Sequence, residues 1–283
     1  MTNSNFLHVA DNVITVFAGG DGNTVDASAL SSGNRVVVAG GAGADVLTGG
    51  AGNDSFSVSR AVLAHAGTRI TGGGGRDTLV LTDSGAVTTV GISGIGTIRL
   101  ASTGNNSLTL RDANFAGIGA RVISVQGGDS GNNITEATVS AGLRAILIGG
   151  ANADTIVAGR EATMTGGSGA DLFVLTTPGS AKTPDKNTIT DFAAASDRLA
   201  FSSAGFGLGI AGAGAAPKQL PAGLFSPEPN GTFTSSTERF AYDRSNGALY
   251  FDADGIVPAN SPMRIATIAN HAALGAANLL FVA

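Results

Sequence analysis

The stretch GGAGADVLTGGAGNDSFSV, residues 40–58, contains the pattern Gly-Gly-x-Gly-x-Asp twice, nine residues apart. A large apolar residue stands two positions after each aspartate, Leu47 in the first copy and Phe56 in the second. Glycine permits backbone angles that other residues avoid, so each copy is suited to a tight turn that carries one carboxylate. Repeated units of this length predict turns that alternate with short strands.

The composition of the whole chain is that of an all-β protein rich in turns. Its 283 residues include 43 glycines, 43% hydrophobic residues and 13% charged residues, with no cysteine and no tryptophan. Glycine costs about 1 kcal/mol relative to alanine inside a helix, so this content disfavours a helical fold. The apolar fraction excludes a disordered tract, and the glycines lack the three-residue period of collagen. The absence of cysteine excludes disulfides and thiolate metal sites.

Charge and hydropathy limit the partners. The net charge of −5 and the scarcity of lysine argue against a nucleic-acid partner. The first residues, MTNSNFLHVADNV, have neither the basic nor the apolar region of a secretory signal peptide. No apolar run reaches the roughly 20 residues that a membrane-spanning helix needs, so no transmembrane segment is expected.

The glycine-aspartate pattern recurs along the chain. Exact copies begin at Gly40, Gly49, Gly72 and Gly166, and a fifth copy from Gly149 has Asn152 in place of the third glycine. Composition alone would not produce four exact copies, so the pattern is a structural repeat.

A longer duplication frames these turns. Residues 14–45 align without a gap to residues 123–154, at an offset of 109, and each block is followed by a further turn, at 71 and at 165. The repeat blocks span about 14–81 and 123–175. Short apolar segments between the turns, such as 35–40 and 144–149, predict strands. We therefore expect an all-β fold, a parallel β-roll or β-solenoid whose core is a ladder of stacked side chains.

The predicted turns supply the oxygen ligands that calcium prefers. Their glycines bring backbone carbonyls together, and the aspartate adds a carboxylate, but two stacked turns are needed for the six to eight oxygens of a calcium shell. Like turns would stack about every 18 residues. Asp154 and Asp171 are 17 apart, whereas Asp54 and Asp77 are 23 apart and need an insertion within 59–69. Carboxylates stacked so closely repel each other without a cation, so the fold should depend on calcium.

Two earlier turns extend the prediction. Asp45 should stack beneath the turn at 19–23, and the turn at 127–132 should precede Asp154. A metal-free interpretation also exists, because aspartate in a glycine turn can bond its own backbone and serve only as a corner. For Asp21 and Asp129 both interpretations stay open. The predicted calcium-binding residues are Gly40, Gly41, Gly43, Asp45, Gly49, Gly50, Gly52, Asp54, Gly72, Gly73, Gly75, Asp77, Gly149, Gly150, Asn152, Asp154, Gly166, Gly167, Gly169 and Asp171, together with Asp21 and Asp129.

The repeats from about residue 14 to 180 resemble those of RTX, or haemolysin-type, calcium-binding repeat proteins. The resemblance implies a parallel β-roll with Ca²⁺ in its turns, export of the unfolded chain through a type I ABC exporter, and folding on extracellular calcium. Residues 187–201, NTITDFAAASDRLAF, resemble the segment that closes such a roll, and 240–255, FAYDRSNGALYFDADG, resemble a hairpin near the end of many family members. The apolar tail corresponds to the uncleaved export signal. We expect a roll over 1–186 and a capping and secretion region over 187–283.

One stretch of the hairpin has a second interpretation. The sequence DADG at 252–255 begins like an EF-hand loop, but Met263 stands where that loop needs a bidentate glutamate. The end of a hairpin is therefore the expected role.

The sequence favours a non-enzymatic function. The string Gly-Asp-Ser-Gly at 128–131 occupies the place of a repeat turn, and no other catalytic pattern has the context that it requires. Because the repeats start by about residue 14, the roll itself is expected to be the product. We predict a secreted or cell-surface structural, adhesive or surface-layer protein. Residues 1–12 are too short to cap the first coil, which predicts an exposed strand edge and self-assembly into an oligomer, filament or layer. The alternative is a small secreted enzyme or toxin, acting on polysaccharide or membrane, with the roll as scaffold.

Overall fold

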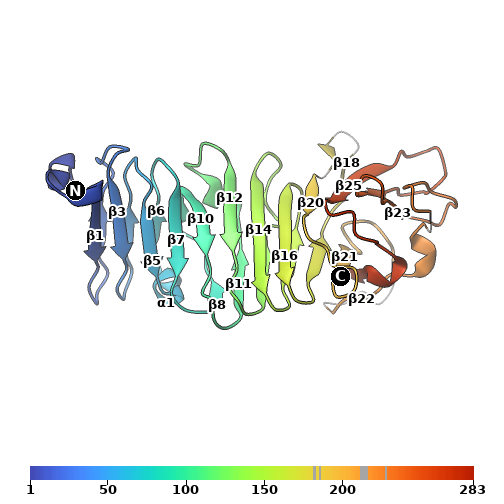
Figure 1. Ribbon diagram of the computed structural model, residues 1–283, viewed down its shortest axis with the longest axis horizontal. Coiled ribbons are helices and arrows are strands. Elements are labelled where there is room, and N and C mark those ends of the chain that lie inside the picture. The colour runs from blue at the N-terminus through green and yellow to red at the C-terminus, as the bar shows by residue number, and fades with distance from the viewer. Residues whose placement is uncertain (181–182, 185, 211–215, 227) are drawn as a thin grey trace. The chain divides into compact units, whose positions relative to one another are not determined.

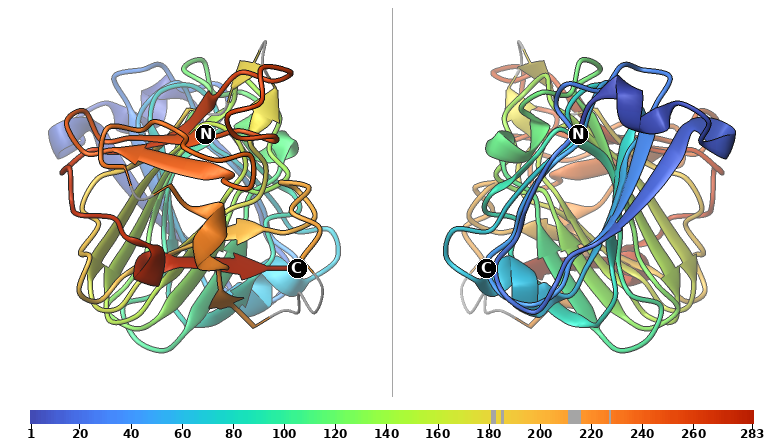
Figure 2. Two further views of the ribbon diagram at one scale, coloured as in Figure 1. Left: turned by 90° about the vertical axis from the view of Figure 1, so that its right-hand side faces the viewer. Right: turned by 90° about the vertical axis from the view of Figure 1, so that its left-hand side faces the viewer.

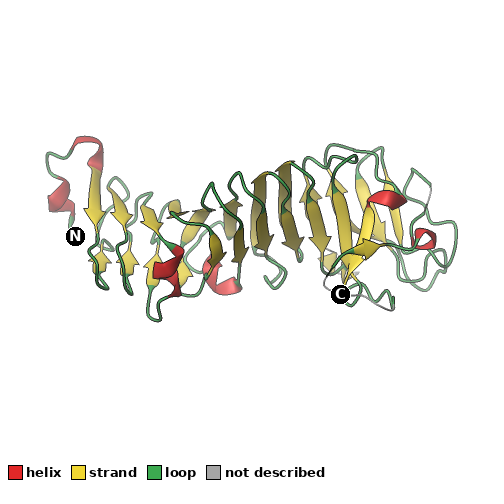
Figure 3. Ribbon diagram, turned by 90° about the horizontal axis from the view of Figure 1, so that it is seen from below, coloured by secondary structure: helices red, strands yellow, loops and turns green. Residues whose placement is uncertain are grey.

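The computed structural model describes residues 1–180, 183–184, 186–210, 216–226 and 228–283. Strands make up nearly all of its regular structure, and the helices are short (Figure 3). They are α1 (Arg60–Ala64) and the 3₁₀ segments η1 (Asn3–Phe6), η2 (Ala10–Asn12), η3 (Asp112–Phe115), η4 (Ala222–Leu224) and η5 (Ala276–Asn278). Within the described ranges no helix has the length and hydropathy to cross a membrane.

The chain forms two compact units. The first contains Met1–Ile134 and Gly142–Ile146, and the second contains Thr135–Ala141 and Leu147–Ala283.

The first unit is a coil of parallel strands (Figure 1). Each strand of its longest sheet pairs with the strand one coil later in the chain, and all of these pairings are parallel. That sheet contains β1 (Val13–Phe17), β3 (Arg35–Ala39), β5 (Ser55–Val58), β7 (Asp77–Leu81), β10 (Ile95–Arg99) and β12 (Val122–Gln126). Another contains β2 (Thr24–Asp26), β4 (Val46–Thr48), β6 (Arg69–Thr71) and β9 (Ile92–Ser93), and a third contains β8 (Gly85–Val87) and β11 (Asn106–Thr109); β13 (Asn132–Thr135) and β14 (Arg144–Ala151) begin in this unit.

The core of the first unit is the predicted ladder of apolar side chains. Val38 pairs with Phe56, and Phe56 with Leu79, in the register of three consecutive coils. All three side chains are fully buried. Alternation along each strand sends these residues inward and their neighbours outward, which is why one large apolar residue follows each aspartate by two positions. The parallel β-roll predicted from the repeats is therefore confirmed.

A helical insertion accounts for the long coil between Asp54 and Asp77. Helix α1 follows β5, and the Ser59 hydroxyl accepts a hydrogen bond from the amide of Val62, 3.4 Å away. Val62 and Leu63 are buried. The chain thus leaves the coil for one capped turn of helix and returns in register, since Ser55 pairs with Thr78.

The second unit also contains strands that pair in parallel with those of the next coil. One sheet contains the end of β14, then β16 (Ala162–Ser168), β20 (Asn187–Ile189), β25 (Met263–Ile268), β24 (Ala248–Phe251) and β23 (Phe240–Asp243). The other contains β15 (Thr155–Ala158), β17 (Leu172–Leu175), β21 (Arg198–Ser202), β26 (Leu279–Val282) and β22 (Lys218–Gln219), and β18 (Gly179–Ser180) pairs with β19 (Thr183–Pro184).

Antiparallel strands close both sheets of the second unit. The hairpin β23–β24 pairs antiparallel with β25, and β22 pairs antiparallel with β26 (Figure 2, left). An aromatic cluster lies beneath this cap, where the rings of Phe201 and Phe240 stack with centroids 3.9 Å apart and Phe206 and Phe251 pack against them. The hairpin expected within 240–255 is therefore present as β23 and β24.

The ladder predicts a large difference between two phenylalanines of the first unit. Phe56 is 0% exposed and Phe17 is 81% exposed. Phe56→Ala should lower the free energy of unfolding by about 3–5 kcal/mol because it leaves a cavity in the stack. Phe17→Ala should change it by less than about 0.5 kcal/mol. Urea unfolding in saturating calcium measures both, and equal losses would show that the ladder is not the core.

Candidate metal-binding turns

Buried aspartates link successive coils of the first unit. Asp54 Oδ1 accepts the amide of Val36, 2.8 Å away and 18 residues earlier, and Asp77 Oδ1 accepts the amide of Asp54 at 2.7 Å across 23 residues. Asp45 Oδ1 accepts the amide of Asn23 at 2.8 Å across 22 residues. The turns therefore stack as their spacing predicts, with one carboxylate oxygen of each bound to the backbone of the preceding coil.

Buried aspartates link successive coils of the second unit in the same way. Asp171 Oδ1 accepts the amide of Asp154 at 2.9 Å, 17 residues earlier, and Asp197 Oδ1 accepts the amide of Asp171 at 3.1 Å across 26 residues. Asp154, Asp171 and Asp197 are all buried. The predicted stack of Asp154 on Asp171 thus extends by one coil that the repeat pattern does not mark.

The second carboxylate oxygen lies against the first glycine of its own turn. In all five turns a Cβ on that glycine would crowd Oδ2 of the aspartate. These glycines are Gly40, Gly49, Gly72, Gly149 and Gly166. The buried Oδ2 atoms of Asp45, Asp77 and Asp171 have no hydrogen-bond donor, whereas Asp54 Oδ2 accepts the amide of Gly50 at 2.6 Å. Asp54 therefore resembles a metal-free corner, and the other three carboxylates each have one uncompensated oxygen.

Backbone carbonyls of the preceding coil approach several glycines of these turns closely, because the glycines have no side chains. Gly73 and Gly167 have φ angles of +97° and +98°, and a Cβ on either would collide with the carbonyl oxygen of Gly50 or Gly150 in the preceding coil. Any side chain there would be strained and would separate the turns. The remaining turn positions make similar close backbone approaches or have left-handed backbone angles: Gly41, Gly43, Gly52, Gly75, Asn152 and Gly169.

Burial makes these carboxylates difficult to ionise. Burial raises the pKa of Asp77 to about 7, and the neighbouring Asp54 charge adds to the effect. Burial is also the main cause that raises the pKa of Asp54 and of Asp171, and the charges of Asp197 and Asp191 add to it at Asp171. A cation beside these groups would stabilise their charged forms.

The donor set fits calcium. Carboxylate and carbonyl oxygens are the hard ligands that Ca²⁺ takes in irregular arrangements, and an uncompensated buried oxygen is the feature that a bound cation would satisfy. No three His, Cys, Asp or Glu side chains converge on a metal position in the described part of the chain. Asp45, Asp77 and Asp171 would therefore each hold a separate ion in their own turns, together with backbone carbonyls and water.

Asp21 and Asp129 do not belong to the stack of buried aspartates that link successive coils. Both side chains are exposed. In the earlier turn, Asn23 takes the place that Asp45 has one coil later. Thr24, which follows Asn23, pairs with Val46, which follows Asp45. The duplication offset of 109 gives Asn132 as the equivalent of Asn23, and Asn132 is buried and accepts a hydrogen bond from Asn106 at 2.8 Å.

Two aspartates of the closing segment, residues 187–201, also accept hydrogen bonds from turn amides, although they were not predicted as ligands. Asp191 accepts the amides of Gly166 and Gly167 at 2.9 and 2.8 Å, and Asp197 Oδ2 accepts the amide of Ala193 at 2.8 Å. The only sequence signal for them was the resemblance of 187–201 to a roll-closing segment, because neither follows three glycines.

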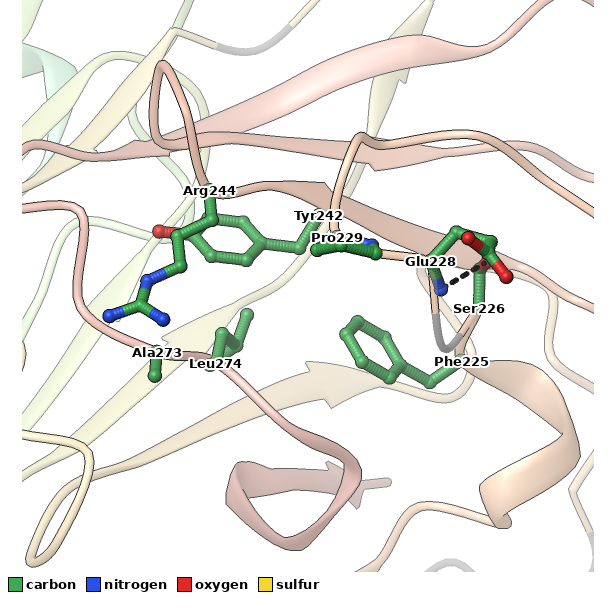
Figure 4. Close-up of a pocket in the computed structure, with 8 residues that line it drawn as sticks. All are labelled: Phe225, Ser226, Glu228, Pro229, Tyr242, Arg244, Ala273 and Leu274. Atoms are coloured by element: carbon green, nitrogen blue, oxygen red, sulfur yellow. Dashed lines mark hydrogen bonds between the residues drawn. The ribbon is translucent and has the colours of Figure 1, made fainter.

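A pocket of about 150 Å³ lies beside the hairpin of the second unit (Figure 4). Its two hydroxyl groups are engaged, since Ser226 Oγ donates to the Thr232 carbonyl at 2.7 Å and the Tyr242 hydroxyl donates to the Ala272 carbonyl at 3.0 Å. Among the described residues that line this pocket, neither hydroxyl therefore donates to a side chain that could act as a general base, so the pocket does not support the alternative of an enzyme. The lining residues are Phe225, Ser226, Glu228, Pro229, Tyr242, Arg244, Ala273 and Leu274.

These features define a parallel β-roll with stacked, carboxylate-bearing glycine turns. Residues 7–207 match the family model described as Peptidase M10 serralysin C terminal, and the chain belongs to this family. The family is the RTX-type calcium-binding β-roll region of serralysins, outside their catalytic part, which confirms the resemblance drawn from the repeats. No curated protein and no solved structure matches the chain.

The raised pKa of Asp77 predicts an unusual pH dependence for the calcium-stripped protein. Its pKa is about 7 in the folded state and about 3.9 when unfolded, so between these values the folded state binds more protons. The fraction of folded protein in EDTA should therefore fall as pH rises from about 4 to about 7. Asp77→Asn should reduce this slope, as circular dichroism at several pH values would show. Identical slopes in the two proteins would contradict the assignment.

Proposed function

We propose that this protein is a secreted β-roll that folds when it meets extracellular calcium and then acts as a structural, adhesive or surface-layer component. The observation that supports the proposal is the uncompensated Oδ2 atom in three stacked turns, those of Asp45, Asp77 and Asp171. A fold with such oxygens in its interior is costly without a cation, and it becomes favourable when calcium binds. Membership of the serralysin C-terminal family supports calcium as the cation.

Dependence on calcium suits export of an unfolded chain. Where free calcium is scarce, buried carboxylates would oppose folding and keep the chain extended for a type I ABC exporter. Outside the cell, calcium binding supplies the missing free energy, because affinity for the folded state alone shifts the folding equilibrium. The absence of cysteine means that this transition needs no disulfide formation.

Calcium should drive a coil-to-β transition in this protein. Circular dichroism of EDTA-stripped protein, titrated with calcium and separately with magnesium, should show β-structure with calcium alone, near the roughly 10⁻⁴–10⁻³ M typical of extracellular modules. Asp77→Asn should raise the calcium midpoint and lower the amount of calcium bound. Asp26→Asn is the control, because Asp26 is exposed in the same unit. A chain that is folded and heat-stable in EDTA would sink the proposal.

The proposed assembly role is supported by the open edge of the first unit. Strand β1 is the outermost strand of its sheet, and no strand in the described part of the chain pairs with its outer side (Figure 2, right). Ile14 and Val16 face the same way as the fully buried Val36 and Val38 but remain partly exposed. The N-terminal segment covers part of this end, since Phe6 is buried, yet it leaves the strand edge free. An uncovered, largely apolar edge strand is a template for pairing with a second copy.

Assembly through β1 predicts a charge-sensitive oligomer. At high concentration in calcium, light scattering should report a species larger than the monomer, and Val16→Lys should return it to the monomer. Ser107→Lys, which adds the same charge on β11 in the interior of its sheet, should leave the oligomer intact. A wild-type protein that stays monomeric excludes assembly but leaves calcium-dependent folding untouched.

A further inference from the structure

The loop after β24 contains two carboxylates that the roll does not use. Asp252 is 1% exposed, and its Oδ2 atom is buried with no hydrogen-bond donor. Asp254 has a buried Oδ1 atom that also lacks a donor. The amide of Asp254 donates to Asp252 Oδ1 at 3.1 Å, which folds the loop so that both carboxylates belong to one turn.

No positive side chain compensates this pair. Among the described residues, no Lys, Arg or His forms an ion pair with Asp252 or Asp254. The nearest guanidinium in the facing loop, that of Arg239, donates to the carbonyls of Ser236 and Glu238 at 2.9 and 2.8 Å. A buried carboxylate beside a second, half-buried one is unfavourable without a counter-charge, because burial and mutual repulsion act in the same direction.

Backbone oxygens of the facing loop crowd the same turn. Gly255 has a φ of +68°, and a Cβ there would collide with the carbonyl oxygen of Ser235 and come within 3.1 Å of that of Glu238. The facing loop is itself fixed, because the Glu238 carboxylate accepts bonds from the amide and hydroxyl of Thr234 at 2.6 and 2.8 Å. The turn therefore presents carboxylates and carbonyls on rigid supports, with glycine keeping the space open.

We infer that the turn formed by Asp252, Asp254 and Gly255 binds one Ca²⁺ ion, in a site separate from the glycine-aspartate turns of the roll. The two carboxylates supply two negative charges, and nearby carbonyl oxygens and water complete the hard-oxygen shell that calcium accepts. Met263 stands where an EF-hand loop has its glutamate, so backbone oxygens of the facing loop and water would supply the ligands that the two carboxylates do not. Such an ion would tie the hairpin to the loop at 234–239.

A proton shared between the two carboxylates is the competing explanation. It would also satisfy one of the uncompensated oxygens, and it requires no metal. The two explanations differ in what replaces the charge pair: two amides would remove a calcium site, but they would leave calcium stoichiometry unchanged if the pair only shared a proton.

The distribution of tyrosine allows this site to be observed separately. The chain has two tyrosines and no tryptophan, and both tyrosines, Tyr242 and Tyr250, lie in the hairpin. Tyr250 precedes Asp252 by two residues. Terbium takes the same hard oxygen ligands as calcium, and its tyrosine-sensitised emission requires an ion close to the ring. We expect full-length protein with Tb³⁺ to show this emission, calcium to abolish it by competition, and magnesium to have little effect.

Variants assign the emission to the turn. The double variant Asp252→Asn/Asp254→Asn should lose the emission and bind one calcium fewer at saturation by equilibrium dialysis. Glu228→Gln, which removes an exposed carboxylate in the same unit, should retain the emission. Tyr250→Phe should lose most of it while keeping the full calcium count, which separates loss of the antenna from loss of the site.

Two results would overturn the inference: a wild-type protein without sensitised emission, or a double variant with unchanged emission and calcium count. If the double variant fails to fold, the competition experiment on the wild-type protein and Tyr250→Phe still decide the question. Failure here would leave the proposed calcium-dependent folding of the roll intact, because that rests on Asp45, Asp77 and Asp171.

Discussion

The structure depends on a hydrogen bond between each buried turn aspartate and the backbone one coil earlier. Asp77 to Asp54 in the first unit and Asp171 to Asp154 in the second show the same arrangement, with an Oδ1 that accepts an amide across 23 or 17 residues. These bonds fix the register between coils, and the register places Phe56 against Leu79 in the core. The high glycine content follows from this constraint, because the backbones can approach so closely only where no Cβ intervenes.

The same constraint would link folding to the proposed cation. A carboxylate must be buried to reach the amide of the preceding coil, and burial disfavours its charge. One oxygen is compensated by the amide, and at Asp54 the amide of Gly50 compensates the other. At Asp45, Asp77 and Asp171 the turn supplies no second donor. Replacing the cation by a further amide is thus possible in this fold, as Asp54 shows, so the three open oxygens are a property of those turns and not of β-rolls in general.

Much of the fold was predictable because the spacing of the repeats determines which turns stack and which side chains enter the core. The spacing of Asp54 and Asp77 predicted both the stacking and the insertion that α1 occupies, and the residue two after each aspartate predicted the core ladder. The turn position held by Asn132 was not recognised, since asparagine in a glycine turn carries no charge signal and Asp129 lay nearby. Asp197 was missed for a different reason: its position is set by pairing of β21 with β17, a contact between distant segments that local sequence does not report.

The two capping solutions follow from how a parallel coil ends. An edge strand leaves backbone N–H and C=O groups unpaired, and a parallel coil has such an edge strand at each end unless a strand of another kind covers it. In the second unit an antiparallel hairpin and β22 meet this need, at the cost of a loop that buries Asp252 beside Asp254. A metal ion at that loop would make the cap depend on the same extracellular signal as the roll. In the first unit β1 is the outermost strand of its sheet, and among the described residues no antiparallel strand covers it.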